Sequence, residues 1–172
     1  MRILVFSVLI ILNFVISTTW LGAIAFGGIL PNTALIIVVS YALLRDDVEG
    51  AIFGFGAGLL HDLMFGGIVG ITALLMAAIG FFAAKPFRDF YKENYIAPIV
   101  LVACASLAYE FMFYVMNFLL LGRTDFFRYL GTIILPTTAY NLVLCIFIYK
   151  GIYGINKLVE KREYRKRGLM KK

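Results

Sequence analysis

The chain has 172 residues, of which 62% are hydrophobic, and its mean hydropathy is +0.93. Charged residues make up only 15%, and none of them lies between residues 3 and 44, which excludes a water-soluble domain. The apolar runs are continuous rather than alternating in polarity, so we expect an all-α integral membrane protein.

Charged, glycine-containing and proline-containing breaks divide residues 1–149 into about six predicted transmembrane helices, followed by a basic tail over residues 150–172. The predicted helices cover residues 3–21, 30–44, 51–65, 68–84, 95–121 and 129–149. The first could instead be a signal peptide, with Ala23 and Ala25 as a cleavage pattern. We favour an uncleaved helix because the apolar run continues beyond it.

The distribution of basic residues predicts the orientation of these helices. One side would hold Arg2, Arg45, Lys85, Arg88, Lys92 and the nine basic residues of the tail, and the other side only Arg123 and Arg128. Short cytoplasmic loops are enriched in lysine and arginine. We therefore expect a multi-pass membrane protein with both termini in the cytoplasm.

The third predicted helix carries small residues at every fourth position. The stripe consists of Gly50, Gly54, Gly58, Asp62 and Gly66. Small residues at this spacing allow two helices to approach closely in a membrane. We favour packing against another helix of the same chain, and the alternative is packing against a helix of a partner.

Burying the carboxylate of Asp62 in this apolar setting costs free energy, and two roles are open for it. It could accept hydrogen bonds from the first N–H groups of the fourth helix, or cap the turn at Gly66 and Gly67, and so hold the hairpin together. Alternatively, it pairs with a cation of a partner or ligand. The neighbouring His61 points about 100° away around the helix, and we expect it to be a hydrogen-bonding residue rather than a catalyst.

Polar residues also lie inside the last two helices. Glu110 and Asn117 share one face of the fifth helix, and Asn141 follows Pro136, which is expected to kink the sixth. We predict a polar seam between these two helices. A carboxyl group at this depth is either a functional site or a protonated side chain that hydrogen-bonds across helices.

The tail has nine basic residues and two acidic ones, a net charge of +7. Five of its basic residues form a dense cluster, namely Lys161, Arg162, Arg165, Lys166 and Arg167. We favour an anchor on anionic lipid, and the alternative is a docking surface for an acidic cytoplasmic partner.

No motif of an enzyme is present, and no catalytic residue is assigned. One histidine and two cysteines in apolar runs do not indicate a metal site or a disulfide, so we expect no metal and no cofactor. No nucleic-acid partner is expected.

Residues 31–75 resemble the core of the rod shape-determining protein MreD family. The matching residues are Pro31, Gly54, Gly58, Leu59, Asp62, Gly66 and Gly70. Asn32 stands where many members have an acid, and Thr72 where many have asparagine. About six helices and a basic C-terminus also fit this family.

The resemblance implies a protein of the bacterial cytoplasmic membrane that is not an enzyme and belongs to the elongation complex, which guides lateral peptidoglycan synthesis. Partners of such proteins are the single-span protein MreC and, further, RodA, a class B transpeptidase and the actin-like MreB. The resemblance also implies a fold like that of the S-components of energy-coupling-factor transporters. A vitamin-binding S-component is therefore the alternative function, and a helical scaffold with no role in the wall is a third.

Overall fold

The computed structural model describes residues 2–19, 29–65, 69–83, 85, 96–119 and 125–169, and their regular structure is helical. For residues 2–7, 65, 118, 119, 160 and 162–169 the backbone alone is described. The elements are α1 (Arg2–Thr19), α2 (Thr33–Leu44), α3 (Asp47–Phe65), α4 (Ile71–Phe82), α5 (Ile96–Tyr114) with the π-helical η2 (Val115–Leu119), α6 (Phe126–Tyr129), the π-helical η3 (Leu130–Ile134) and α7 (Leu135–Leu169).

The prediction of an all-helical chain is confirmed, and each predicted apolar segment contains one helical stretch. Two stretches of the described chain are long and apolar enough to cross a membrane, Ile96–Asn117 and Phe126–Val159. Val8–Thr19, α2 and α4 are apolar but shorter. At about 1.5 Å per residue, the 12 residues of α2 and of α4 span roughly 18 Å, less than the ~30 Å of a hydrocarbon core.

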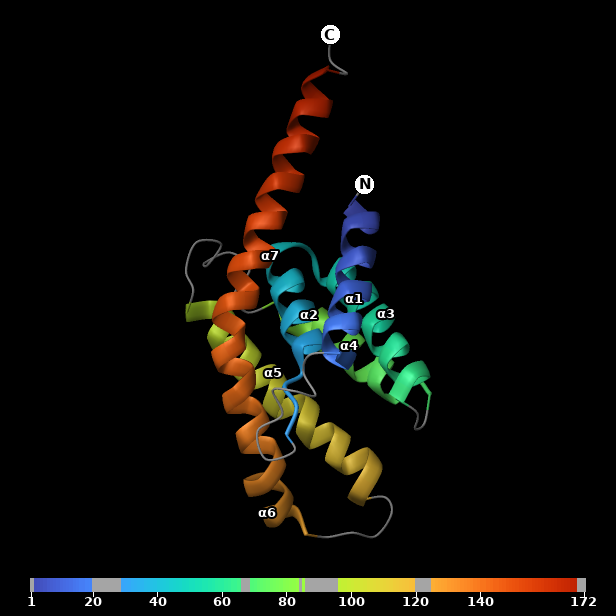
Figure 1. The fold of residues 1–172 in the computed structure, drawn as a ribbon, viewed down its shortest axis with the longest axis vertical. Coiled ribbons are helices and arrows are strands. Elements are labelled where there is room, and N and C mark those ends of the chain that lie inside the picture. Colours follow the sequence, from blue (N-terminus) through green and yellow to red (C-terminus); the bar gives the residue numbers. More distant parts are fainter. Residues whose placement is uncertain are drawn as a thin grey trace.

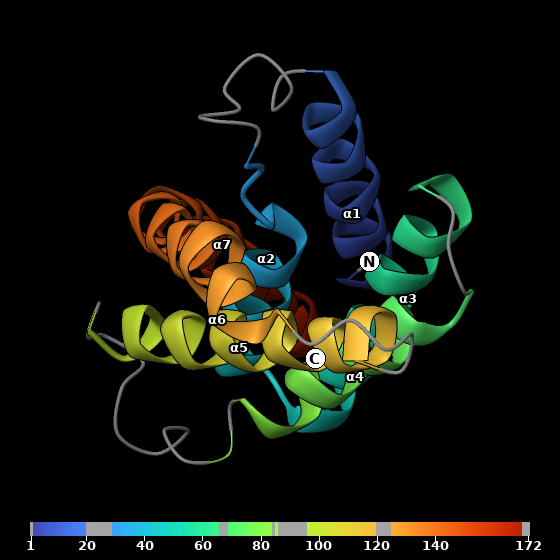
Figure 2. The same ribbon diagram turned by 90° about the horizontal axis from the view of Figure 1, so that it is seen from below.

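The centre of the molecule is α2. Its side chains are buried almost all round, and it contacts α1, α3, α4, α5 and α7. A helix that is apolar on every face must be covered by other helices or by lipid, and α2 lies among the other helices in the end-on view of Figure 2. Asn32 caps α2 by accepting a hydrogen bond from the N–H of Leu35 at 3.0 Å.

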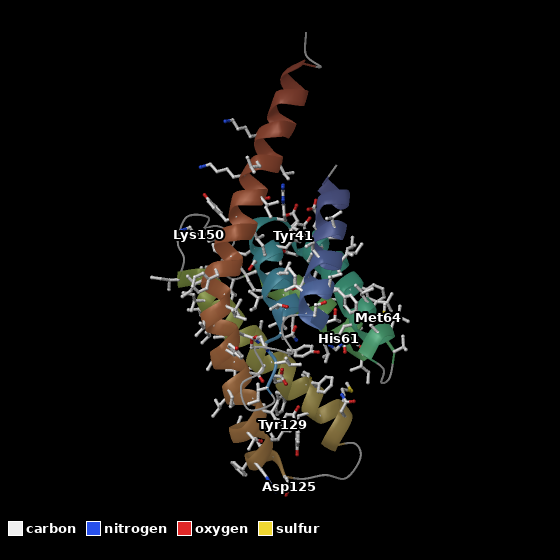
Figure 3. All side chains as sticks on the ribbon, viewed as in Figure 1. Tyr41, His61, Met64, Asp125, Tyr129 and Lys150 are labelled. Carbon is white, nitrogen blue, oxygen red and sulfur yellow. The ribbon has the colours of Figure 1, made fainter. Side chains whose placement is uncertain are left out.

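Figure 1 places the start of α1 and the far end of α7 at the same end of the bundle, called here the terminal end. Tyr41 and Lys150 lie toward this end, whereas Asp125 and Tyr129 lie at the opposite end (Figure 3). At the terminal end the hydroxyl of Tyr41 donates to Glu49 Oε2 at 2.9 Å and so ties α2 to α3. Glu49 lies in the first turn of α3, where a negative charge is favourable.

The predicted end of the last helix at residue 149 is wrong. The helix α7 continues without a break to Leu169, because Tyr149 and Ile152 belong to the buried core and the charged residues that follow are good helix formers. The α-helical geometry is interrupted earlier instead. The π-helical η3 directly precedes the first turn of α7, where Pro136 lies.

Candidate functional site

The glycine stripe of α3 lies against α4. A Cβ atom added at Gly58 would lie 2.5 Å from Ala73 Cα, and one added at Gly54 would overlap the carbonyl oxygen of Met76. At Gly50 it would lie 2.6 Å from the carbonyl oxygen of Gly80. The glycines therefore let the two backbones touch, and the stripe is used for packing within the chain.

Gly80 is a part of this contact that the sequence analysis missed. A Cβ atom there would overlap the carbonyl oxygen of Gly50. The pairs follow the register of an antiparallel hairpin, with Gly58 beside Ala73, Gly54 beside Met76 and Gly50 beside Gly80. Small residues repeated along both α3 and α4 could have indicated this contact.

Gly70, a residue of the family resemblance, does not make this kind of close contact. Gly70 is the N-cap of α4 with φ at +107°, and a Cβ atom there would meet nothing within 4 Å. Its backbone conformation, rather than close packing, is what favours glycine. Gly66 lies outside the described residues.

Asp62 makes the hydrogen bonds predicted for a residue that closes the hairpin. Its Oδ2 atom accepts from the N–H of Gly70 at 2.8 Å and from the N–H of Ala73 at 3.2 Å. Both donors belong to the first turn of α4, which has no capping side chain of its own. The buried carboxylate thus caps a helix from across the hairpin, where the helix dipole also favours a negative charge.

A buried polar centre joins the other helices at the same depth. Asn141 of α7 donates from Nδ2 to Ser106 Oγ of α5 at 2.9 Å, and its Oδ1 accepts from the N–H of Asn32 at 2.8 Å. Tyr109 of α5 interacts with the side chains of Thr72 and Asn32. Asn32 and Thr72, the two positions at which the chain departs from the family resemblance, therefore both lie beside Tyr109.

The predicted seam between α5 and α7 contains, among the described residues, only one of those that were singled out, Asn141, together with Ser106. Within the described part of the chain, Asn117 of η2 instead donates to the carbonyl oxygen of Phe113, one turn earlier in α5, at 3.1 Å. Ser106 was missed because a lone serine in an apolar helix has no pattern that distinguishes it.

A partly open cavity of about 520 Å³ lies among α1, α2, α3, α5 and the η3–α7 region. Most of its wall is apolar. Its polar lining comes from Asn13, Ser17, Asn32, Thr33, His61, Tyr109, Glu110, Tyr129 and Thr137. His61 and Tyr129, labelled in Figure 3, reach it from different helices.

Glu110 is the carboxylate of this cavity. Its side chain is only 8% exposed and, unlike Asp62, it makes no hydrogen bond with the part of the chain that the structure describes. A carboxylate in mainly apolar surroundings attracts a hydrogen-bond donor or a cation. The cavity is therefore suited to an apolar group that carries one such donor.

Within the described residues, no cluster of three or more histidine, cysteine, aspartate or glutamate side chains is arranged to hold a metal ion. Cys104 and Cys145 are both free thiols, the first exposed and the second buried. Of the five predicted tail residues, Lys161 is exposed, and the side chains of the other four lie outside the described residues.

Comparison with family models matches residues 1–159 to the family described as rod shape-determining protein MreD. No curated protein and no solved structure matches the chain.

Proposed function

Because the chain belongs to the MreD family, which determines rod shape, we propose that it is a membrane scaffold of the cell-elongation complex. In this role it supports lateral peptidoglycan synthesis by binding an MreC-like single-span partner. MreD is a shape-determining family and not a known family of enzymes. RodA, a class B transpeptidase and MreB are proposed as further partners in the same complex.

We propose that the terminal end of the bundle faces the cytoplasm and that the chain crosses the membrane several times. This orientation is supported by the basic residues, because Arg2, Arg45, Lys85 and the tail would all lie on the cytoplasmic side. The lining of the cavity then extends from Phe53, whose ring packs on Tyr41, to Tyr129 at the outer end of the bundle.

The observation that carries the proposed partner site is the cavity with Glu110 in its wall. The glycine stripe of α3 is covered by α4 and is not free to receive a partner's helix. The cavity, by contrast, offers a concave apolar surface with a few polar groups, the usual form of a binding site. The proposed occupant is an apolar membrane-proximal segment of the partner that presents a donor or cation to Glu110.

A matched pair of substitutions on α3 tests this site. Leu60 lines the cavity, whereas Leu63 is 63% exposed on the outside of the bundle. Leu60→Trp should leave the protein abundant in the membrane but abolish co-purification of the MreC-like partner and give rounded cells. Leu63→Trp should preserve both. An abundant Leu60→Trp variant that still binds the partner would contradict the proposed site.

The cavity also supports the alternative function, an S-component that binds a vitamin. Depletion of the protein in its host separates the two. Rounded cells with diffuse lateral wall labelling support the scaffold, whereas rod-shaped cells that lose uptake of one vitamin support the S-component.

A further inference from the structure

The helix α7 carries the basic tail as a continuation of the membrane domain. It runs from Leu135 to Leu169, and Figure 1 shows it passing well beyond the ends of the other helices. Nine basic residues and two acidic ones lie from Lys150 onward. The tail is thus a continuation of α7, and its direction at Lys150 is set by that helix.

The base of this extension is fixed by packing. Tyr149 is 2% exposed and Ile152 4% exposed, and both belong to the hydrophobic core. The rings of Tyr149 and Tyr153 stack with their centres 6.2 Å apart, and Asn156 is buried one turn after Ile152. The bundle therefore sets the direction of α7 for almost two turns past Lys150.

This direction carries the dense basic cluster away from the lipid. About 20 residues cross the hydrocarbon, which residues 130–150 supply, and the headgroup layer takes roughly four more. At about 1.5 Å per residue, Lys161 then lies ~10 Å beyond the lipid surface and Arg167 ~20 Å beyond it. A typical tilt of about 20° shortens these distances by only a few per cent.

The attraction of anionic lipid is weak at such distances. With a Debye length of about 8 Å, the surface potential falls to roughly a quarter at Lys161 and roughly a tenth at Arg167. Lys150 and Lys157 remain near enough to the headgroups to contact them. The lipid therefore accounts for the first two basic residues of the tail but not for the cluster between residues 161 and 167.

We propose that residues 161–167 of α7 form a docking site for an acidic surface of a cytoplasmic protein. Five of these seven residues are basic and only Glu163 is acidic. A surface with clustered aspartate and glutamate complements this charge, and such pairing steers association strongly at low salt. The proposal rests on the cytoplasmic orientation of the terminal end given above.

The first test locates the cluster relative to the lipid. The full chain with Cys104→Ala and Tyr164→Cys is labelled with a fluorophore and placed in nanodiscs of neutral phosphatidylcholine, or with about 30% phosphatidylglycerol. Cys145 stays, because it has no exposed surface. Quenching by aqueous iodide should be strong and equal in both discs. Quenching by nitroxide-labelled lipid that rises several-fold with phosphatidylglycerol would overturn the proposal in favour of a lipid anchor.

The second test measures binding of a fluorescent glutamate-rich peptide to the full chain in neutral discs. Replacing the five clustered basic residues with glutamine should weaken binding by about tenfold or more. The control pair Lys150→Gln and Lys157→Gln should change it less than about threefold. Equal affinity of the five-glutamine variant and the unaltered chain would overturn the proposal. Both faces of a disc are open to solution, so neither test depends on the membrane orientation or on the MreC-like partner.

Discussion

Replacing Asp62 tests whether a buried carboxylate holds the α3–α4 hairpin together. Its Oδ2 atom accepts hydrogen bonds from Gly70 and Ala73, and its side chain is 5% exposed. Asparagine keeps a side-chain oxygen at this place, whereas leucine has a similar volume and no acceptor. The two variants therefore separate the hydrogen bonds from the charge and from the packing.

The expected loss follows from the two donors. A buried N–H group without a partner costs about 1–3 kcal/mol, so Asp62→Leu should lower the free energy of unfolding by roughly 2–6 kcal/mol. Asp62→Asn keeps an acceptor but loses the charge, which strengthens such bonds and interacts with the dipole of α4. Its expected loss is about 1 kcal/mol.

Thermal unfolding in detergent and protein level in the membrane measure these effects. The unaltered chain should be the most stable, Asp62→Asn slightly less stable, and Asp62→Leu clearly the least stable. Leu63→Ala serves as the control, because its side chain lies outside the bundle and should change little. If Asp62→Leu is as stable as Asp62→Asn, the capping role is refuted. If Asp62→Asn is abundant but fails to bind the partner, the carboxylate pairs with a partner's cation instead.

Gly58→Ala should destabilise the protein by about 1–3 kcal/mol, because its Cβ atom would meet the backbone of α4. Gly56→Ala should be tolerated, since the atom nearest to its Cβ lies 3.9 Å away, and thermal unfolding compares the two variants. Asn141→Leu should cost about 1–3 kcal/mol, because it leaves the N–H of Asn32 and the hydroxyl of Ser106 without this partner. Asn117→Leu, which removes a local hydrogen bond from η2 to Phe113 of α5, should cost less by the same assay. In a variant that lacks Cys104 and Cys145, a cysteine introduced by Glu163→Cys should resist an impermeant maleimide added to intact cells, and labelling from outside would contradict the proposed orientation.

The sequence predicted features that depend on neighbours along the chain. In the described residues, six helical stretches overlap the predicted apolar segments, because charge, glycine and proline mark where a helix in an apolar setting ends. The hydrogen bonds of Asp62 were also predictable, since the residue and the first turn of α4 are joined by a short connection. The end of α7 was not, because the tail continues a helix that tertiary packing of Tyr149 and Ile152 supports.

Contacts between distant segments were harder to predict. Asn141 was singled out, but its partners are Ser106, 35 residues away, and the N–H of Asn32, 109 residues away. Nothing local in the sequence brings these groups together. The cavity is lined by at least four helices. The sequence therefore identified Glu110 as a carboxyl group that is costly to bury, but it did not predict the cavity that Glu110 faces.

Asp62, Asn141 and Glu110 are all buried, but they differ in their hydrogen bonds to the rest of the chain. Asp62 and Asn141 each have two hydrogen bonds or more to groups of the chain, so their burial is explained by the fold itself. Glu110 faces the cavity and makes no such bond with the described residues. A buried carboxyl group without such a bond lowers stability, and this supports the proposed role of Glu110 in binding a partner. Glu110→Gln should therefore leave the melting temperature unchanged or higher while weakening co-purification of the partner. A variant that unfolds more easily would instead make Glu110 a structural residue.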